Sequence, residues 1–154
     1  MPIDVGATAP DFALKDQHGQ TVSLADYRGR QNVLLVFYPW SFSRICTDEM
    51  REIRDALPTL QGEDSAVLAV SCDAMFTQRV YAEHEGLQFA VLTDFWPHGA
   101  VASAYGVFDE RLGAAVRGSF IIDRGGVVQW RILNGVGEAR DLGDYQTVLK
   151  GLSA

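Results

Sequence analysis

Cys46 is the residue whose type and position most directly offer reactive chemistry in this chain. It follows the continuous apolar run Val33–Tyr38 and begins a stretch, from about Cys46 to Leu57, in which apolar residues recur at helical spacing. The carboxyl ends of buried strands carry the sites of α/β proteins, and the first turn of a helix offers unpaired N–H groups and a positive dipole end. Both features favour the thiolate, which is the nucleophilic form of cysteine. Position alone is equally compatible with an inert buried cysteine that packs as a small hydrophobe.

The other residues with ligand or nucleophile chemistry do not group by spacing. Cys72 is the second of the two cysteines, and the chain has no C-x-x-C motif. His18, His84 and His98 are scattered without the spacing of a zinc site. There is no P-loop, and Gly135–Arg140 lacks the third glycine of a dinucleotide fingerprint. The sequence therefore predicts no metal and no bound cofactor.

The elements that must position Cys46 alternate along the chain. The patterns predict strands at Thr21–Leu24, Val33–Tyr38, Val67–Ser71, Phe89–Thr93, Ser119–Ile122 and Val127–Ile132. They predict helices at about Cys46–Leu57, Phe76–Glu85 with Gly86 as its stop, Ala100–Tyr105 and Leu142–Leu152. On the first helix, the predicted wet face consists of Asp48, Glu49, Glu52 and Asp55. This order is typical of the α/β class, with a central mixed sheet flanked by helices.

Length and charge exclude several classes of function. A chain of 154 residues suits a single domain, here 1–154. Its net charge of −7, without a cluster of basic residues, argues against a nucleic-acid partner. The longest stretch without a charged residue, Phe95–Phe108, is too short to span a bilayer, so no membrane partner is expected. No secretory signal is visible at the N-terminus, and we expect a cytoplasmic protein.

The residues around Cys46 resemble a known family signature. Pro39, Ser43 and Cys46 fit the pattern P-x-x-x-T/S-x-x-C of the peroxiredoxin active site. Further blocks look like peroxiredoxin blocks in the expected order, namely Gly6–Phe12, Asp26–Gly29, Asp94–His98 and Arg117–Asp123. Through Phe95–Ala100 and Ala104–Phe108 the chain is most similar to the AhpE-type one-cysteine peroxiredoxins of actinobacteria. The resemblance covers nearly the whole chain and implies a thioredoxin-like fold with an N-terminal hairpin extension.

The resemblance implies a role for each residue of the site. Cys46 is the peroxidatic nucleophile, which attacks a peroxide oxygen and becomes a sulfenic acid. Arg117 favours the thiolate and holds the peroxide oxygens, while Ser43 donates a hydrogen bond to the sulfur or the peroxide. Pro39 shields the sulfur, and Glu49 orients the arginine. Taken singly, Arg117 is also compatible with a surface salt bridge, Ser43 with a helix N-cap and Glu49 with a first-turn acid.

Two positions depart from the usual family pattern. Thr47 stands where many members have proline directly after the peroxidatic cysteine, although the AhpE-like group tolerates it. Arg44, two residues before Cys46, is an uncommon charge there, and we expect its side chain to point to water.

The resemblance implies a thiol-dependent peroxidase for hydrogen peroxide and organic hydroperoxides, with peroxynitrite as a further candidate substrate. No resolving cysteine stands near the C-terminus or five residues after Cys46, so recycling by an external thiol is expected, either mycothiol with a mycoredoxin or a thioredoxin-type protein. The alternatives are a two-cysteine mechanism that uses Cys72, a peroxide sensor that relays oxidation from Cys46, and a non-catalytic interaction module. The loop aromatics are compatible with packing in the core or at a dimer interface, and also with an apolar substrate surface; these are Trp40, Phe42, Phe95 and Trp96. A homodimer is expected from the family.

Overall fold

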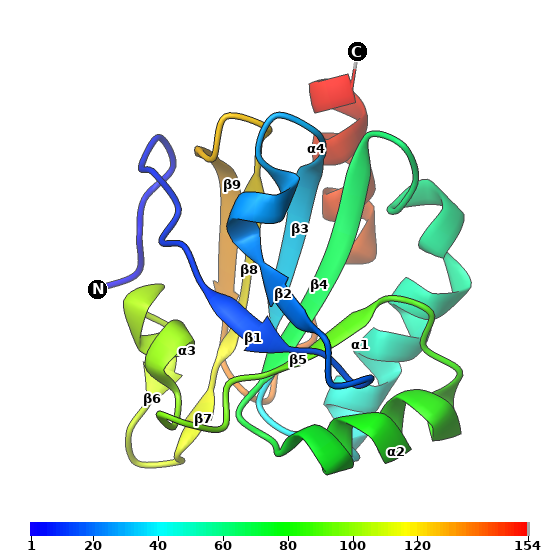
Figure 1. Ribbon diagram of the computed structural model, residues 1–154, viewed down its shortest axis with the longest axis vertical. Coiled ribbons are helices and arrows are strands. Elements are labelled where there is room, and N and C mark those ends of the chain that lie inside the picture. Colours follow the sequence, from blue (N-terminus) through cyan, green and yellow to red (C-terminus); the bar gives the residue numbers. More distant parts are fainter. Residues whose placement is uncertain (154) are drawn as a thin grey trace.

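The computed structural model describes residues 1–153 and has a central sheet with helices on both faces (Figure 1). The strands are β1 Ala13–Lys15, β2 Thr21–Ser23, β3 Asn32–Phe37, β4 Ser65–Ser71, β5 Ala90–Thr93, β6 Phe108–Asp109, β7 Ala114–Ala115, β8 Arg117–Ile122 and β9 Val128–Asn134. The α-helices are α1 Arg44–Asp55, α2 Met75–Glu85, α3 Ala100–Ala104 and α4 Leu142–Ser153, and short 3-10 helices lie at Leu24–Tyr27 and Leu57–Thr59. None of the helices within residues 1–153 is long and apolar enough to cross a membrane.

Seven strands form the main sheet, in the order β2-β1-β5-β4-β3-β8-β9. β3, β4 and β5 run parallel, whereas β8 and β9 on one side and β1 and β2 on the other are antiparallel to their neighbours. This is the predicted mixed α/β sheet, and the β1–β2 hairpin at its edge is the expected N-terminal hairpin extension. β6 and β7 pair separately in a small two-stranded sheet that the sequence pattern did not predict.

Strand β3 shows why the sheet can be buried on both faces. All six of its residues are buried. Leu34 and Val36 point into a core beneath α1, α2 and α4, while Val33, Leu35 and Phe37 point into a second core with α3 and the N-terminal segment. A continuous apolar run thus supplies two cores, because successive side chains of a strand point to opposite faces. In Figure 1, α3 lies on the opposite side of the sheet from α1 and α4.

Most predicted boundaries hold within two or three residues. The first helix begins at Arg44 rather than Cys46 and ends at Asp55. Gly86, in the left-handed conformation with φ 67°, ends α2 as expected. The strand predicted at Ser119–Ile122 begins earlier, at Arg117, which places that residue inside the sheet.

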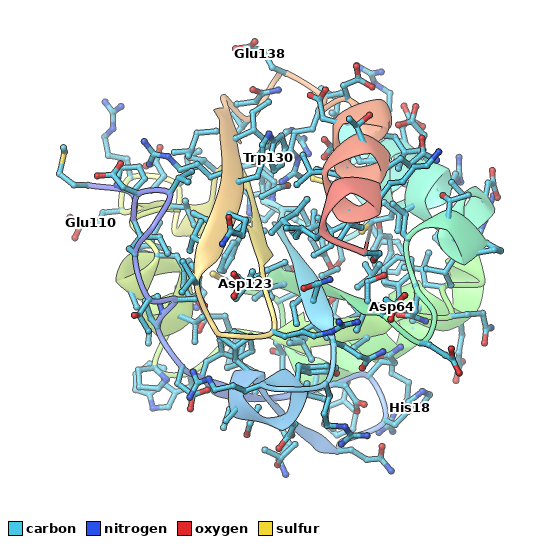
Figure 2. The ribbon with its side chains drawn as sticks, turned by 90° about the horizontal axis from the view of Figure 1, so that it is seen from above. His18, Asp64, Glu110, Asp123, Trp130 and Glu138 are labelled. Carbon is cyan, nitrogen blue, oxygen red and sulfur yellow. The ribbon has the colours of Figure 1, made fainter. Side chains whose placement is uncertain are left out.

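The hairpin between β8 and β9 is formed as predicted. Asp123 closes its turn by accepting hydrogen bonds from the backbone N–H groups of Gly125 and Val127, at 2.9 and 3.0 Å. Trp130 of β9 lies between this strand and α4 (Figure 2), where its ring packs edge-on against Tyr145. This contact packs α4 against β9, and the Tyr145 hydroxyl also lies 2.7 Å from that of Ser119 on β8, the strand that begins with Arg117.

Candidate active site

Cys46 lies at the end of β3 that carries the loop 39–43, in the first turn of α1. The loop is held to the neighbouring strand at its start, where the Tyr38 N–H donates to the Val70 carbonyl. Pro39 is buried at the beginning of the loop. The Cys46 side chain is fully buried in the core beneath α1. The strand end, the loop and the helix N-terminus therefore meet at this thiol, as the sequence predicted.

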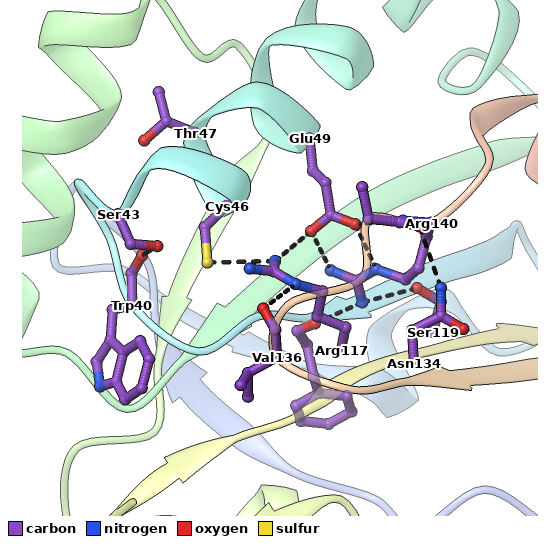
Figure 3. Close-up of polar contacts among 12 residues, drawn as sticks. Trp40, Ser43, Cys46, Thr47, Glu49, Arg117, Ser119, Asn134, Val136 and Arg140 are labelled. Carbon is purple, nitrogen blue, oxygen red and sulfur yellow. Dashed lines mark hydrogen bonds and ion pairs between the residues drawn. The ribbon is translucent and has the colours of Figure 1, made fainter.

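Arg117 approaches the sulfur from β8. Its Nη1 lies 3.3 Å from the Sγ atom of Cys46 and 2.5 Å from Oε1 of Glu49, and its Nε donates to the Val136 carbonyl at 2.9 Å (Figure 3). The Nη2 atom makes no hydrogen bond to any of residues 1–153, and it is not sealed from solvent. Since the residue as a whole is only 2% exposed, the alternative of a surface salt bridge is wrong.

Glu49 is buried, which corrects its placement on the wet face of the first helix. The residue also lies in the second turn of α1, so it is not a first-turn acid. Each of its two carboxylate oxygens accepts hydrogen bonds from arginine. Oε1 accepts from Arg117 and from Nη2 of Arg140 at 2.9 Å, and Oε2 accepts from the backbone N–H and Nε of Arg140 at 2.8 and 2.9 Å. A helical carboxylate thus joins two arginines from distant parts of the chain.

Arg140 is the participant that the sequence analysis missed. It precedes α4, and its Nη1 donates to the carbonyls of Phe37 and Gly118 and to the Ser119 hydroxyl. It therefore fastens the segment after β9 to the ends of β3 and β8. The only sequence signal is one arginine within a glycine-containing loop, a signal that many surface arginines share.

The electrostatics of Glu49 follow from these contacts. Burial opposes ionisation of the carboxyl group, but the hydrogen bonds and charge of Arg140, supported by the charge of Arg117, outweigh it and lower the pKa of Glu49. Glu49 is therefore an anion at neutral pH and holds Arg117 by a charge-assisted hydrogen bond.

Ser43 stands at the N-cap position of α1, but its side chain does not cap the helix. Its hydroxyl donates to the Trp40 carbonyl at 2.9 Å, which closes the loop 39–43 on itself. Because a serine hydroxyl has one proton, donation to sulfur or peroxide requires that this bond be exchanged.

Thr47, the departure from the usual proline, has a local partner. Its hydroxyl lies 3.1 Å from that of Tyr81 on α2, and both groups are buried. Burial raises the pKa of Tyr81 to about 12, so this hydroxyl stays protonated and available as a donor. Arg44 is exposed, as predicted.

Cys72 follows β4, which runs parallel beside β3 as predicted. On β4, Val67 and Ala69 point toward the core that contains Cys46, whereas Val70 points toward the opposite core. Cys72 stands two residues after Val70, so its side chain points to the same face of the sheet as that of Val70. There its thiol faces the backbone of Ala115 in the second core. Burial, with the nearby acidic groups, raises the pKa of the Cys72 thiol to about 12. A bond between the two thiols would require the sheet end to rearrange.

The four loop aromatics are exposed, so a purely core role is wrong for each. Trp40, Phe42 and Phe95 are about half exposed, and Trp96 is 82% exposed. Among residues 1–153, no three side chains of His, Cys, Asp or Glu are grouped so that they could hold a metal ion.

The fold and site define a thioredoxin-like protein with a cysteine beside a buried arginine. Comparison with known proteins identifies the family to which this chain belongs. The model of the AhpC/TSA family matches residues 5–131. The chain is 47% identical over 152 residues to alkyl hydroperoxide reductase E of Mycobacterium tuberculosis, with 99% of each chain covered. It is 31% identical to the chloroplastic 2-Cys peroxiredoxin BAS1 of Hordeum vulgare, covering 96% of this chain and 74% of the relative.

Solved structures agree with these relatives. Peroxidoxin BcpB from Mycobacterium tuberculosis superposes with a TM-score of 0.87 at 26% identity, over 97% of this chain and 98% of the other. AhpC of Enterococcus faecalis gives a TM-score of 0.87 at 28% identity, over 98% and 92%. The chain therefore belongs to the AhpC/TSA family, the peroxiredoxins, and is a thiol peroxidase of that family.

Proposed function

We propose that this chain reduces hydrogen peroxide and organic hydroperoxides, with peroxynitrite as a further substrate, through a sulfenic acid at Cys46 that an external thiol recycles. The Cys46 thiolate attacks the terminal peroxide oxygen, so that an S–O bond forms while the O–O bond breaks. The sulfur is oxidised by two electrons, and the leaving alkoxide or hydroxide takes up a proton and departs as alcohol or water. No cofactor enters this step.

The observation that carries the proposal is the geometry of Arg117. One terminal guanidinium nitrogen, Nη1, lies 3.3 Å from the sulfur, while the other, Nη2, has no hydrogen-bond partner within residues 1–153. A peroxide beside the sulfur would accept a hydrogen bond from this second nitrogen, which would stabilise charge on the breaking O–O bond. Two arginines and Glu49 carry one net positive charge, so a thiolate at Cys46 would balance the buried cluster.

Pro39 and Ser43 complete the proposed site. Buried Pro39 shields the sulfur from water, and Ser43 exchanges its bond to Trp40 for one to the peroxide or sulfur. The exposed ring of Trp40 in the same loop would give the hydrocarbon part of an organic hydroperoxide an apolar surface.

Recycling by an external thiol is supported by the placement of Cys72 in the opposite core and by its raised thiol pKa. We propose mycothiol with a mycoredoxin, or a thioredoxin-type protein, as the reductant in the cytoplasm. Exposed Phe95 and Trp96 support a homodimer, since large exposed aromatic side chains are enriched at protein interfaces.

The proposal is tested by intact mass after one equivalent of hydrogen peroxide, with a sulfenic-acid trap and a Cys46→Ser control. A trap adduct on Cys46 that is absent from the control supports the proposal. Loss of two hydrogens with Cys46 joined to Cys72 in one chain would replace it by the two-cysteine mechanism. Fast oxidation with slow turnover by every thiol would favour a peroxide sensor, and the absence of any rapid change would favour an interaction module.

A further inference from the structure

We propose that Asp73 and Gln78 are positioning residues for the reaction at Cys46, because together they hold Ser41 at the middle of the loop 39–43. The inference rests on the proposed peroxidase function. Neither residue contacts the sulfur or Arg117. Both act through Ser41, which lies between Pro39 and Ser43.

Asp73 restrains the backbone of the loop. Its Oδ2 atom accepts the Ser41 N–H at 2.9 Å and the Ser71 hydroxyl at 2.6 Å. The Asp73 carbonyl accepts a hydrogen bond from the Thr93 hydroxyl. Asp73 is therefore tied to the ends of β4 and β5 and transfers that fixed position to the loop.

Gln78 restrains the side chain of Ser41 from beneath. Its Oε1 accepts the Ser41 hydroxyl at 2.6 Å, and its Nε2 donates to the Ser71 hydroxyl at 2.7 Å and to the Leu92 carbonyl at 3.0 Å. The Tyr38 hydroxyl lies 2.9 Å from that of Ser41. Gln78, Ser71 and Tyr38 are all fully buried.

The direction of most hydrogen bonds in this network follows from its two acceptor ends. The bond to the Leu92 carbonyl fixes Nε2 of Gln78 as a donor, so Oε1 is an acceptor and Ser41 donates to it. Tyr38 then donates to Ser41 or to Oε1 of Gln78, 3.3 Å away, and Ser71 accepts from Gln78 while it donates to the Asp73 carboxylate. None of these buried polar atoms lacks a partner, and a fully satisfied buried network rigidifies the structure around it.

The loop needs this restraint because Phe42, the residue after Ser41, has a strained backbone. Phe42 has a φ of 72°, in the left-handed region that costs a side-chain-bearing residue energy. Its ring packs against Tyr81, with centroids 4.9 Å apart. Release of Ser41 would let Phe42 relax and would shift Ser43 and the first turn of α1, which carries Cys46. Loss of either restraint should therefore slow the reaction with peroxide and make Cys46 more accessible to larger reagents.

The experiment compares Asp73→Ala with Asp73→Asn, which keeps an acceptor oxygen for Ser41 and Ser71. Ser41→Ala tests the contact with Gln78, and Ser65→Ala is the matched control, because the Ser65 hydroxyl binds the Leu60 carbonyl away from the site. Two quantities are measured on each folded protein: the rate constant of Cys46 oxidation by hydrogen peroxide, and the rate of its alkylation by a bulky maleimide, assigned by peptide mass.

For Asp73→Ala and Ser41→Ala we expect peroxide oxidation to slow about fivefold, a factor typical of the net contribution of one hydrogen bond, and Cys46 alkylation to rise. Asp73→Asn and Ser65→Ala should stay within about twofold of the unmodified protein. Alkylation of Cys72, in the opposite core, reports general opening and should not change.

Unchanged rates in Asp73→Ala and Ser41→Ala, or parallel labelling of Cys72, would overturn the positioning role. So would an Asp73→Asn protein as slow as Asp73→Ala. If the unmodified chain itself fails to react rapidly with peroxide, it is the proposed function that fails.

Discussion

Replacement of Arg117 by alanine separates two ways in which this residue would accelerate peroxide reduction. It would favour the Cys46 thiolate, and it would donate hydrogen bonds to the breaking O–O bond. A free cysteine with a pKa of about 8.5 is already roughly one tenth ionised near neutral pH, so complete ionisation gains only about tenfold. A donor aimed at developing charge is typically worth about 10²–10³ in rate, or about 3–4 kcal/mol.

The structure gives Arg117 both means of assistance. Nη1 reaches the sulfur at 3.3 Å, and Nη2 has no protein partner within residues 1–153. After Arg117→Ala, Glu49 would keep its three hydrogen bonds from Arg140, so the buried carboxylate stays paired and the fold should persist. We expect the rate constant to fall by about 10³-fold at neutral pH, where both effects act, and to stay about 10²-fold low even where the thiol is fully ionised.

The assay is stopped-flow fluorescence, with excess hydrogen peroxide, from pH 6 to 10; Trp40 in the loop next to Cys46 supplies a local signal. Arg117→Lys is the matched control, because it keeps the charge but loses the planar fork of donors. If Arg117→Ala lost only about tenfold at neutral pH and matched the unmodified protein at high pH, ionisation alone would explain the role of Arg117 and the reasoning would be wrong.

Three further predictions concern stability and assembly. Glu49→Gln should lower the free energy of unfolding by about 3–5 kcal/mol at pH 7, since two buried arginines lose their anion. Because the pKa of Glu49 is lowered in the folded protein, the stability that its carboxylate contributes is complete above the unfolded pKa of about 4.3 and is lost as the pH falls through the folded pKa. The free energies of unfolding of the two proteins, measured by urea titration, should therefore converge in acid. Gly86→Ala should lower the free energy of unfolding by about 1 kcal/mol, measured by thermal unfolding, because alanine is strained at the φ of 67°. The added methyl group would make only ordinary contact with the Arg54 side chain, and the rate of peroxide reduction should not change. If the protein forms the proposed homodimer, Trp96→Glu should shift its sedimentation to that of a monomer, and a dimer that persists in the variant would place the interface elsewhere.

The sequence predicted the supporting elements because their patterns are local. The apolar run of β3, the stop at Gly86 and the hairpin around Asp123 each depend on a few neighbouring residues, and all three are present. The short strands β1, β6 and β7 were missed, since segments of two or three residues carry too little alternation to be recognised.

Glu49 and Arg140 show where local patterns fail. The helical pattern assigned Glu49 to the wet face, because amphipathic spacing cannot distinguish a solvated carboxylate from one paired with buried cations. The partner that buries it lies 91 positions later in the chain, in a loop without periodicity. Only the three-dimensional arrangement of α1, β8 and the segment before α4 brings these charges together.

The same arrangement explains why the cluster around Cys46 can be rigid although its sulfur lies next to a loop. Arg117 is fixed at the start of a sheet strand, and Arg140 is fastened to the carbonyls of two strands. Glu49 joins both from a helix packed on the sheet. The loop 39–43, by contrast, is held through the separate network of Ser41, Gln78 and Asp73. Because the charged donors and the loop depend on different contacts, Arg117 substitutions should change the rate with little effect on Cys46 accessibility, whereas Asp73→Ala should change both.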